Sequence, residues 1–317
     1  MGNAKNAGKP TVLNALVGAF SDVRVGVTSI GLDGEELDAV TYLPKPRIRL
    51  TPGTLAATAE SCLTTAEAGY RIVGRTGIMT GLGEIVILEI TRAGILLIGG
   101  PSTVSATERI VGMLRERGAE RVFLDGAFAR GSHAAAGDAM IYVAGAHLSA
   151  SMTAVVQATR FALKKFSLPV VPAVLETLSK ETEIGWVDAS NGFHPLGAVS
   201  AVGSADAVLD KIPPEAAWIY LPKALGPTFA KRFVDRRDEH RVGIVVNDPF
   251  SIVMPDDVLR HLLLTGRDIR VLHPMKILFV AINPFSPAGH RFEGIRFSEA
   301  IRSVTALPVI DVMEEQR

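Results

Sequence analysis

The sequence has a single cysteine and few aromatic residues. Cys62 is the only cysteine among 317 residues, which excludes an internal disulfide framework and suits a reducing cytoplasm. Because Cys62 stands alone between Ser61 and Leu63, we interpret it as a small buried residue rather than as a nucleophile.

Neither positive nor negative charge is in excess, since Lys plus Arg and Asp plus Glu both number 33. This balance gives no electrostatic reason to expect a nucleic acid or an anionic membrane as partner. No run approaches the roughly 18 apolar residues of a membrane span, and the start lacks a signal-peptide pattern. We therefore expect a cytoplasmic protein with no membrane and no nucleic acid bound, and self-association into a homo-oligomer stays open.

Several catalytic and metal-binding signatures are also missing from the sequence. It has no Cys/His zinc spacing, no G-x-S-x-G and no G-x-G-x-x-G after a strand, and its seven histidines are scattered. What is abundant is hydrophobic content of 48% with only 6% aromatic, together with 30 glycines. This composition is typical of an Ala/Val/Leu-rich α/β protein, and the length allows one large or two smaller domains.

The most informative stretch is a glycine-bearing loop that opens a helix. It reads Gly2-Asn3-Ala4-Lys5-Asn6-Ala7-Gly8-Lys9-Pro10-Thr11 and runs directly into an apolar-periodic segment. Such a loop can wrap a phosphate, because small residues let backbone N–H groups converge and the helix N-terminus adds positive potential. Lys9 is then expected to reach the phosphate oxygens.

The match to a phosphate loop departs from the usual pattern in three ways. The loop from Gly2 to Gly8 is one residue longer than usual, and Pro10 stands where a hydroxyl residue normally meets Mg²⁺, with Thr11 one place late. The strand that normally precedes a phosphate loop is missing, so either the sheet lacks this strand or the start of the sequence is truncated. The alternative is an ordinary glycine-bearing turn.

A second signal is the apolar strand at 121–126, which ends in Asp125-Gly126. A carboxylate at this place can lie beside a phosphate loop and orient Mg²⁺ or its water. The turn after the strand at 23–27 carries Asp33, which we expect to help hold the metal together with Thr11 and Asp125. The alternatives are a helix-capping Asp125 and an Asx turn at Asp33.

A later strand, 277–282, ends in Asn283-Pro284. An Asn at the carboxyl end of a strand, where proline forces the chain to turn, presents its amide to whatever lies above the sheet. Asn283 is therefore a candidate for reading a nucleotide base or packing the site. A plain Asx-Pro turn is the alternative.

The pattern of elements favours an α/β fold with a mostly parallel sheet of P-loop NTPase type, extended by a second α/β half. We expect domains at 1–166 and 167–317, the second possibly continuous with the same sheet. Within the first, we predict a helix over 54–68, an antiparallel hairpin of strands 84–90 and 95–98, and a helix over 104–118 capped by Ser or Thr.

Taken together, these motifs resemble one family, the B-type component of the lysine 5,6-aminomutase reactivase. The motifs are Gly-Asn-Ala-Lys-Asn-Ala-Gly-Lys, Thr-Ser-Ile-Gly-Leu-Asp-Gly-Glu, Lys-Pro-Arg-Ile, Gly-Gly-Pro-Ser-Thr, Phe-Leu-Asp-Gly-Ala, Ile-Asn-Pro-Phe-Ser-Pro and Pro-Val-Ile-Asp-Val-Met. The resemblance runs almost from end to end. It implies a P-loop ATPase-like protein that works with a second reactivase component to exchange damaged cobalamin from an adenosylcobalamin-dependent lysine or ornithine aminomutase.

Carried over by position, the resemblance implies that Lys9 grips phosphate, Gly8 shapes the loop and Asp125 lies near Mg²⁺. Where the family would place a hydroxyl residue after the lysine, this chain has Pro10. That departure puts efficient Mg²⁺-dependent hydrolysis in doubt more than phosphate binding.

We expect Lys9 and Asp125 to be catalytic, ATP and Mg²⁺ to be the cofactors, and residues 2–11 with Asn283 to bind the nucleotide. The alternatives are a catalytically weakened nucleotide-binding partner protein, and a P-loop kinase or metallocofactor chaperone acting on a small molecule.

Overall fold

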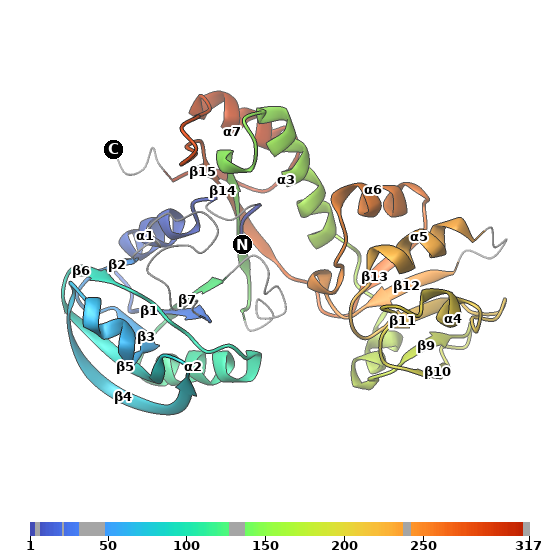
Figure 1. Cartoon of the computed structure of the whole chain (residues 1–317), viewed down its shortest axis with the longest axis horizontal. Helices are drawn as coiled ribbons and strands as arrows, with labels where there is room; N and C mark the ends of the chain where they lie inside the picture. Colours follow the sequence, from blue (N-terminus) through green and yellow to red (C-terminus); the bar gives the residue numbers. More distant parts are fainter. Residues whose placement is uncertain (4–6, 21, 32–47, 127–136, 237–241, 313–317) are drawn as a thin grey trace. The chain divides into compact units, whose positions relative to one another are not determined.

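The computed structural model describes residues 1–3, 7–20, 22–31, 48–126, 137–236 and 242–312. The chain divides into two compact units, Met1–Val156 with Ile277–Arg317, and Gln157–Lys276 (Figure 1). This division differs from the expected boundary at 166/167, because the chain leaves the first unit earlier and returns to it. Only the returning segment continues a sheet of the first unit.

The first unit contains a five-stranded mixed sheet in the order β4-β5-β3-β1-β7. Its strands are β1 (Val25–Ile30), β3 (Leu55–Ala59), β4 (Gly69–Thr80), β5 (Gly83–Arg92) and β7 (Arg121–Gly126). Strand β1 runs parallel to β3 and β7, with Ser29 opposite Asp125, whereas β5 runs antiparallel to β3 and β4. The mostly parallel arrangement that we expected holds on one side of this sheet only.

Two local predictions for the first unit were wrong. Residues 54–68 do not form a helix but the strand β3 and the 3₁₀ helix η1 (Glu60–Thr65), because the small Ala and Thr residues of β3 are buried between β1 and β5. The expected hairpin is also absent from the described residues, since β5 pairs with β3 and β4. Strand β6 (Gly94–Leu96) instead pairs antiparallel with β2 (Ile48–Leu50).

A second sheet in this unit is parallel and contains β15-β14-β8, which are Val309–Asp311, Ile277–Asn283 and Met140–Gly145. Residues 1–3 lie alongside β8, with an isolated parallel bridge from Gly2 to Val143. The Met1 amine donates to Ile141 O at 2.7 Å, and the Asn3 N–H donates to Val143 O at 3.0 Å. The start of the chain therefore contacts the edge of this sheet through one bridge, and among the described residues no strand precedes the loop, as expected from the sequence.

Helix α1 (Lys9–Ala19) packs on the five-stranded and the three-stranded sheets of the first unit. Leu13 and Val17 are buried with residues of the five-stranded sheet, whereas Val12 is buried with Val143 and Ala281 of the parallel sheet. The other helices of the unit are α2 (Val104–Glu116), η3 (Ala146–Leu148) and α7 (Gly294–Arg302), and α3 (Met152–Phe166) contains the boundary between the units. The predicted helix over 104–118 is confirmed as α2, and Thr103 caps it.

The second unit is built on a mixed sheet in the order β10-β9-β11-β12-β13. Its strands are β9 (Ile184–Val187), β10 (Phe193–Ala198), β11 (Trp218–Leu221), β12 (Gly243–Val246) and β13 (Ile269–Val271). Its helices are η4 (Ala173–Lys180), α4 (Ala205–Leu209), α5 (Pro227–Asp235), η5 (Pro249–Ser251) and α6 (Asp256–Leu264). Strands β11, β12 and β13 are parallel, and β9 runs antiparallel to β10 and β11.

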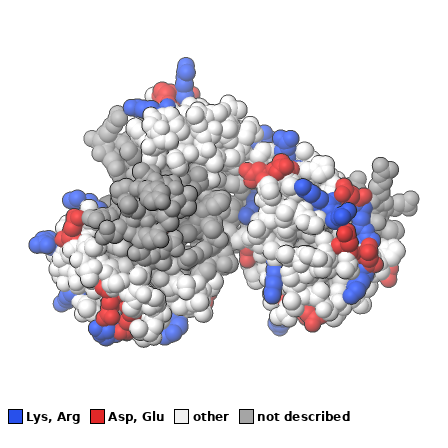
Figure 2. Space-filling model, viewed as in Figure 1, with Lys and Arg blue, Asp and Glu red and all other residues white. Residues whose placement is uncertain are grey.

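Acidic and basic side chains are interspersed on the face shown in Figure 2, in keeping with the balanced composition. None of the helices in the described parts of the chain is long and apolar enough to cross a membrane.

Candidate functional site

The loop that precedes α1 makes its last turn at Gly8. The φ angle of Gly8 is 102°, in the left-handed region, and a Cβ at this position would collide with the Asn283 amide. Glycine is therefore required here by both conformation and space. Gly8, the N-cap residue, has no side chain, and among the described residues no side-chain cap of α1 is seen at the positive end of the helix dipole. Pro10, in this first turn, contributes no N–H group.

Asn283 lies directly behind this turn and is 8% exposed. Its Nδ2 donates to Ala7 O at 3.3 Å, and its Oδ1 accepts from the Phe285 N–H at 3.1 Å. These bonds tie the end of β14 to the loop. The sequence singled out Asn283 for reading a base or packing the site, and its contacts are those of a residue that supports the loop from behind.

Asn3 and Gly145 fix the other side of the loop. The Asn3 side chain donates to Gly145 O at 3.3 Å, and its Oδ1 accepts from the Gly145 N–H at 3.1 Å. A Cβ on Gly145 would lie 2.5 Å from Ala7 O, so the loop passes directly over the end of β8. Asn3, Ala7 and Gly8 are thus held in place by backbone and amide contacts. Ala4, Lys5 and Asn6 lie outside the described residues.

Lys9 and Asp125 come together although they are far apart in the sequence. Burial raises the pKa of the Asp125 carboxyl above its ordinary value, and the positive charges of Lys9 and the Met1 amine oppose that rise. Burial lowers the pKa of the Met1 amine to about 5, with Lys9 adding to the effect and Asp125 opposing it. The mutual electrostatic effects place the three groups in one partly buried site. The structure therefore brings together the two residues that the sequence singled out.

Asp125 is the carboxylate of this site that could hold a hard divalent cation, if a bound phosphate supplies other ligands and offsets the positive charges of Lys9 and the Met1 amine. Carboxylate and hydroxyl oxygens are the ligand types that Mg²⁺ takes from proteins, and it keeps several waters besides. Thr11 follows Lys9 in the first turn of α1, whereas Asp33 lies outside the described residues. Among the residues that can be described, no three or more His, Cys, Asp or Glu side chains form a metal cluster. A cation here would therefore depend on ligands from a bound phosphate.

One neighbouring feature was not among the predicted site residues, the segment Gly99–Pro101. A Cβ on Gly100 would collide with Ser29 O, and the Gly31 N–H donates to Pro101 O at 2.7 Å. This segment crosses the carboxyl end of β1, next to the strand that carries Asp125. The two consecutive glycines, Gly99 and Gly100, are the sequence signal for such a close backbone approach.

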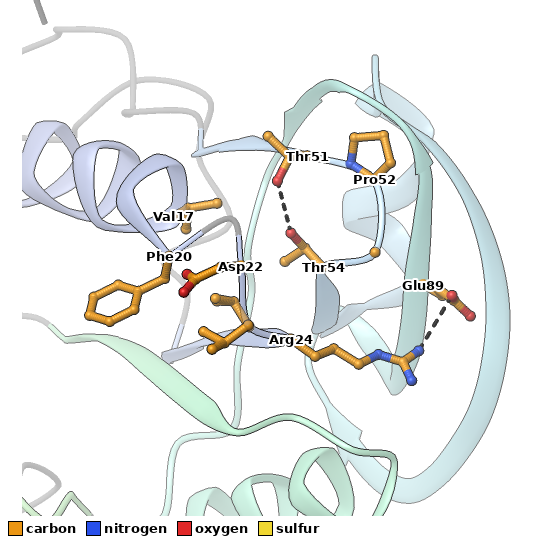
Figure 3. A pocket seen from close by; sticks show the side chains of 11 residues that line it. Val17, Phe20, Asp22, Arg24, Thr51, Pro52, Thr54 and Glu89 are labelled. Atoms are coloured by element: carbon orange, nitrogen blue, oxygen red, sulfur yellow. Dashed lines mark hydrogen bonds and ion pairs between the residues drawn. The ribbon is translucent and has the colours of Figure 1, made fainter.

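A pocket of about 410 Å³ lies at the opposite end of β1 (Figure 3). Arg24 extends toward Glu89, with a 3.4 Å ion pair, and the hydroxyls of Thr51 and Thr54 are 3.3 Å apart. Because the pocket is lined by Val25, the first residue of β1, it is separate from the Asp125 end of the sheet.

The arrangement around α1 can hold an anion. A glycine turn at an uncapped helix start, an ammonium group and a nearby carboxylate are the parts that phosphate and its metal require. No protein-family model, curated protein or solved structure matches this chain.

Proposed function

We propose that this chain binds ATP with Mg²⁺ at the start of α1 and hydrolyses it. The observation that carries the proposal is the electrostatic coupling of Lys9 to Asp125 beside the left-handed turn at Gly8. An ammonium group and a carboxylate that are near enough to affect each other's ionisation can share a triphosphate and its metal. The contacts of Asn283 and Asn3 hold the described ends of the loop in place.

Phosphoryl transfer to water needs positioned charge more than covalent chemistry. Lys9 would neutralise charge on the terminal phosphates, and the start of α1 would add its dipole. Asp125 would orient the metal or one of its waters. Mg²⁺, when bound, supplies the positive charge that stabilises the transferred phosphoryl group.

We further propose that the ATPase belongs to a reactivase that exchanges damaged cobalamin from an adenosylcobalamin-dependent lysine or ornithine aminomutase. The support for this part is the sequence resemblance, and a second reactivase component is the expected partner. Reactivation of an inactivated aminomutase by the chain, its partner component, ATP and fresh cobalamin is the matching assay. No recovery of mutase activity would reject this assignment.

The test of the ATPase is phosphate release from MgATP by the native chain and by Lys9→Ala. We expect turnover to fall by about 100-fold, because the variant loses the charge that faces the phosphates. Lys231→Ala is the matched control, since Lys231 is exposed on α5 of the other unit. Equal turnover in Lys9→Ala and the native chain would reject the role of Lys9.

Pro10 favours a second candidate, a nucleotide-binding partner protein with weakened catalysis. Proline removes one N–H group and one hydroxyl from the first turn of α1. Tight MgATP binding without turnover in the native chain would support this candidate over the ATPase.

A further inference from the structure

A cluster with two histidines lies at the carboxyl ends of β8 and β14, outside the groups assigned to phosphate and metal. His147 Nδ1 is 3.2 Å from Ser286 Oγ, and His290 Nε2 is 2.8 Å from Ala146 O. The Ser286 N–H donates to His290 O at 3.0 Å. One turn after β14 and one after β8 therefore hold the two rings beside each other.

The partners of the inner ring nitrogens fix the hydrogen-bonding character of each neutral ring. A carbonyl oxygen only accepts, so His290 Nε2 carries the proton, and its Nδ1 is left as an acceptor. Ser286 Oγ accepts from the Ala288 N–H at 3.2 Å and still has its own proton, which it can donate to the unprotonated Nδ1 of a neutral His147 ring. The Nε2 of His147 is then a donor. Within the described residues, neither outer nitrogen has a hydrogen-bond partner.

The cluster is also next to the proposed phosphate loop. Ala146, which accepts from His290, follows Gly145, and Gly145 lies against Ala7 O of the loop. Asp125 belongs to the five-stranded sheet and marks the end where metal and terminal phosphates would lie. Since a nucleotide extends away from its terminal phosphates, its nucleoside would lie toward the three-stranded sheet, where the histidines are.

We propose that His147 and His290 recognise the edge of the nucleobase, His147 as donor and His290 as acceptor. This inference rests on the proposed function, because the base must belong to a nucleotide whose phosphates are at Lys9. Nucleobases present a donor and an acceptor side by side on one edge, which matches two rings of opposite hydrogen-bonding character. A bare polyphosphate has no such edge.

The experiment compares MgATP with magnesium tripolyphosphate by titration calorimetry on the full chain. His147→Asn keeps an oxygen that can accept from Ser286 but has no outer ring nitrogen. His290→Gln keeps an amide N–H that can donate to Ala146 O, but its amide oxygen does not occupy the place of the ring Nδ1. The matched control is His261→Asn, an exposed histidine on α6 of the other unit.

We expect each of the two variants to lose about 5- to 10-fold in ATP affinity, as for one hydrogen bond, with tripolyphosphate affinity and the control unchanged. Native ATP affinity in both variants would overturn the inference and leave the proposed function standing. Equal losses for ATP and tripolyphosphate would also overturn it, because the histidines would then only shape the loop. A native chain that binds neither ligand would reject the proposed function itself, and the base assignment with it.

Discussion

Asp125 is an acid whose charged form is disfavoured by its place in the fold. Burial is the largest cause of its raised pKa, and the nearby charges of Lys9 and the Met1 amine compensate only in part. Without a bound cation, the protein is therefore less stable when this carboxyl is ionised than when it is neutral. A buried carboxylate that destabilises the folded protein fits a role in binding, because ligand sites often contain ionisable groups with strongly shifted pKa values.

The substitution Asp125→Asn should raise the stability of the ligand-free protein at pH 7. A pKa raised above the ordinary value of 3.8 means that the stability lost to ionisation appears as pH rises and persists at neutral pH. The neutral amide avoids that loss. We expect a melting temperature about 2 °C or more above that of the native chain. The difference should shrink as pH falls through the raised pKa of the native carboxyl and should be lost by the ordinary value of 3.8.

The matched control is Asp138→Asn, whose side chain is 88% exposed and pairs with Arg115 on the surface. Its melting temperature should change little. MgATP should stabilise the native chain and the control but stabilise Asp125→Asn less. A lower melting temperature of ligand-free Asp125→Asn at pH 7 would mean that attraction to Lys9 outweighs burial.

Among the elements of the site, α1 has in its first turn a residue, Pro10, that favours helix formation but lacks groups that would bind phosphate and metal. Pro10 suits the first turn of a helix, where its N–H would have no intrahelical partner. The same residue removes a donor and a hydroxyl from the end of the helix that would face phosphate. The first turn is thus well formed for folding and incomplete for catalysis.

Replacing Pro10 with Thr should raise the rate of ATP hydrolysis by about tenfold or more, because it restores both the donor and the metal-binding hydroxyl. Pro10→Ala is the matched control, since it restores the N–H alone. Steady-state phosphate release at saturating MgATP measures both. If Pro10→Thr is no faster than Pro10→Ala, the hydroxyl at this position does not act on the metal, and a native rate in both would remove Pro10 as the cause of weak catalysis.

The elements that could be predicted are those whose sequence signal is local. An apolar run that ends in a polar residue predicted β7 and β14, and both are strands that end near Asp125 and Asn283. Strand β3 was mistaken for a helix because its Ala and Thr residues carry little strand signal of their own. What makes it a strand is burial between β1 and β5, which no local pattern contains.

At the scale of the whole molecule, the candidate site is assembled from distant segments. It includes residues 1–3 and 7–9 and the ends of β7, β8 and β14, and β14 lies beyond the second unit in the sequence. The pairing of Lys9 with Asp125 could be predicted because phosphate loops and acidic strand ends belong together. The contact of Asn283 with Ala7, and the return of the chain at Ile277, could not, because each depends on how the sheets assemble.

The division of the chain into two compact units predicts which segments nucleotide binding should stabilise. Hydrogen exchange measured with MgATP at about 100 times its dissociation constant should slow by about 100-fold for amides that exchange by unfolding of the first unit. The protected segments should include α1, β7, β8 and β14, with β14 protected although it follows the whole second unit in the sequence. Exchange in β9, β11 and β12 should change much less, because these strands belong to a separate compact unit. Protection confined to those strands would place the nucleotide on the second unit and would exclude Lys9 and Asp125 as its binding groups.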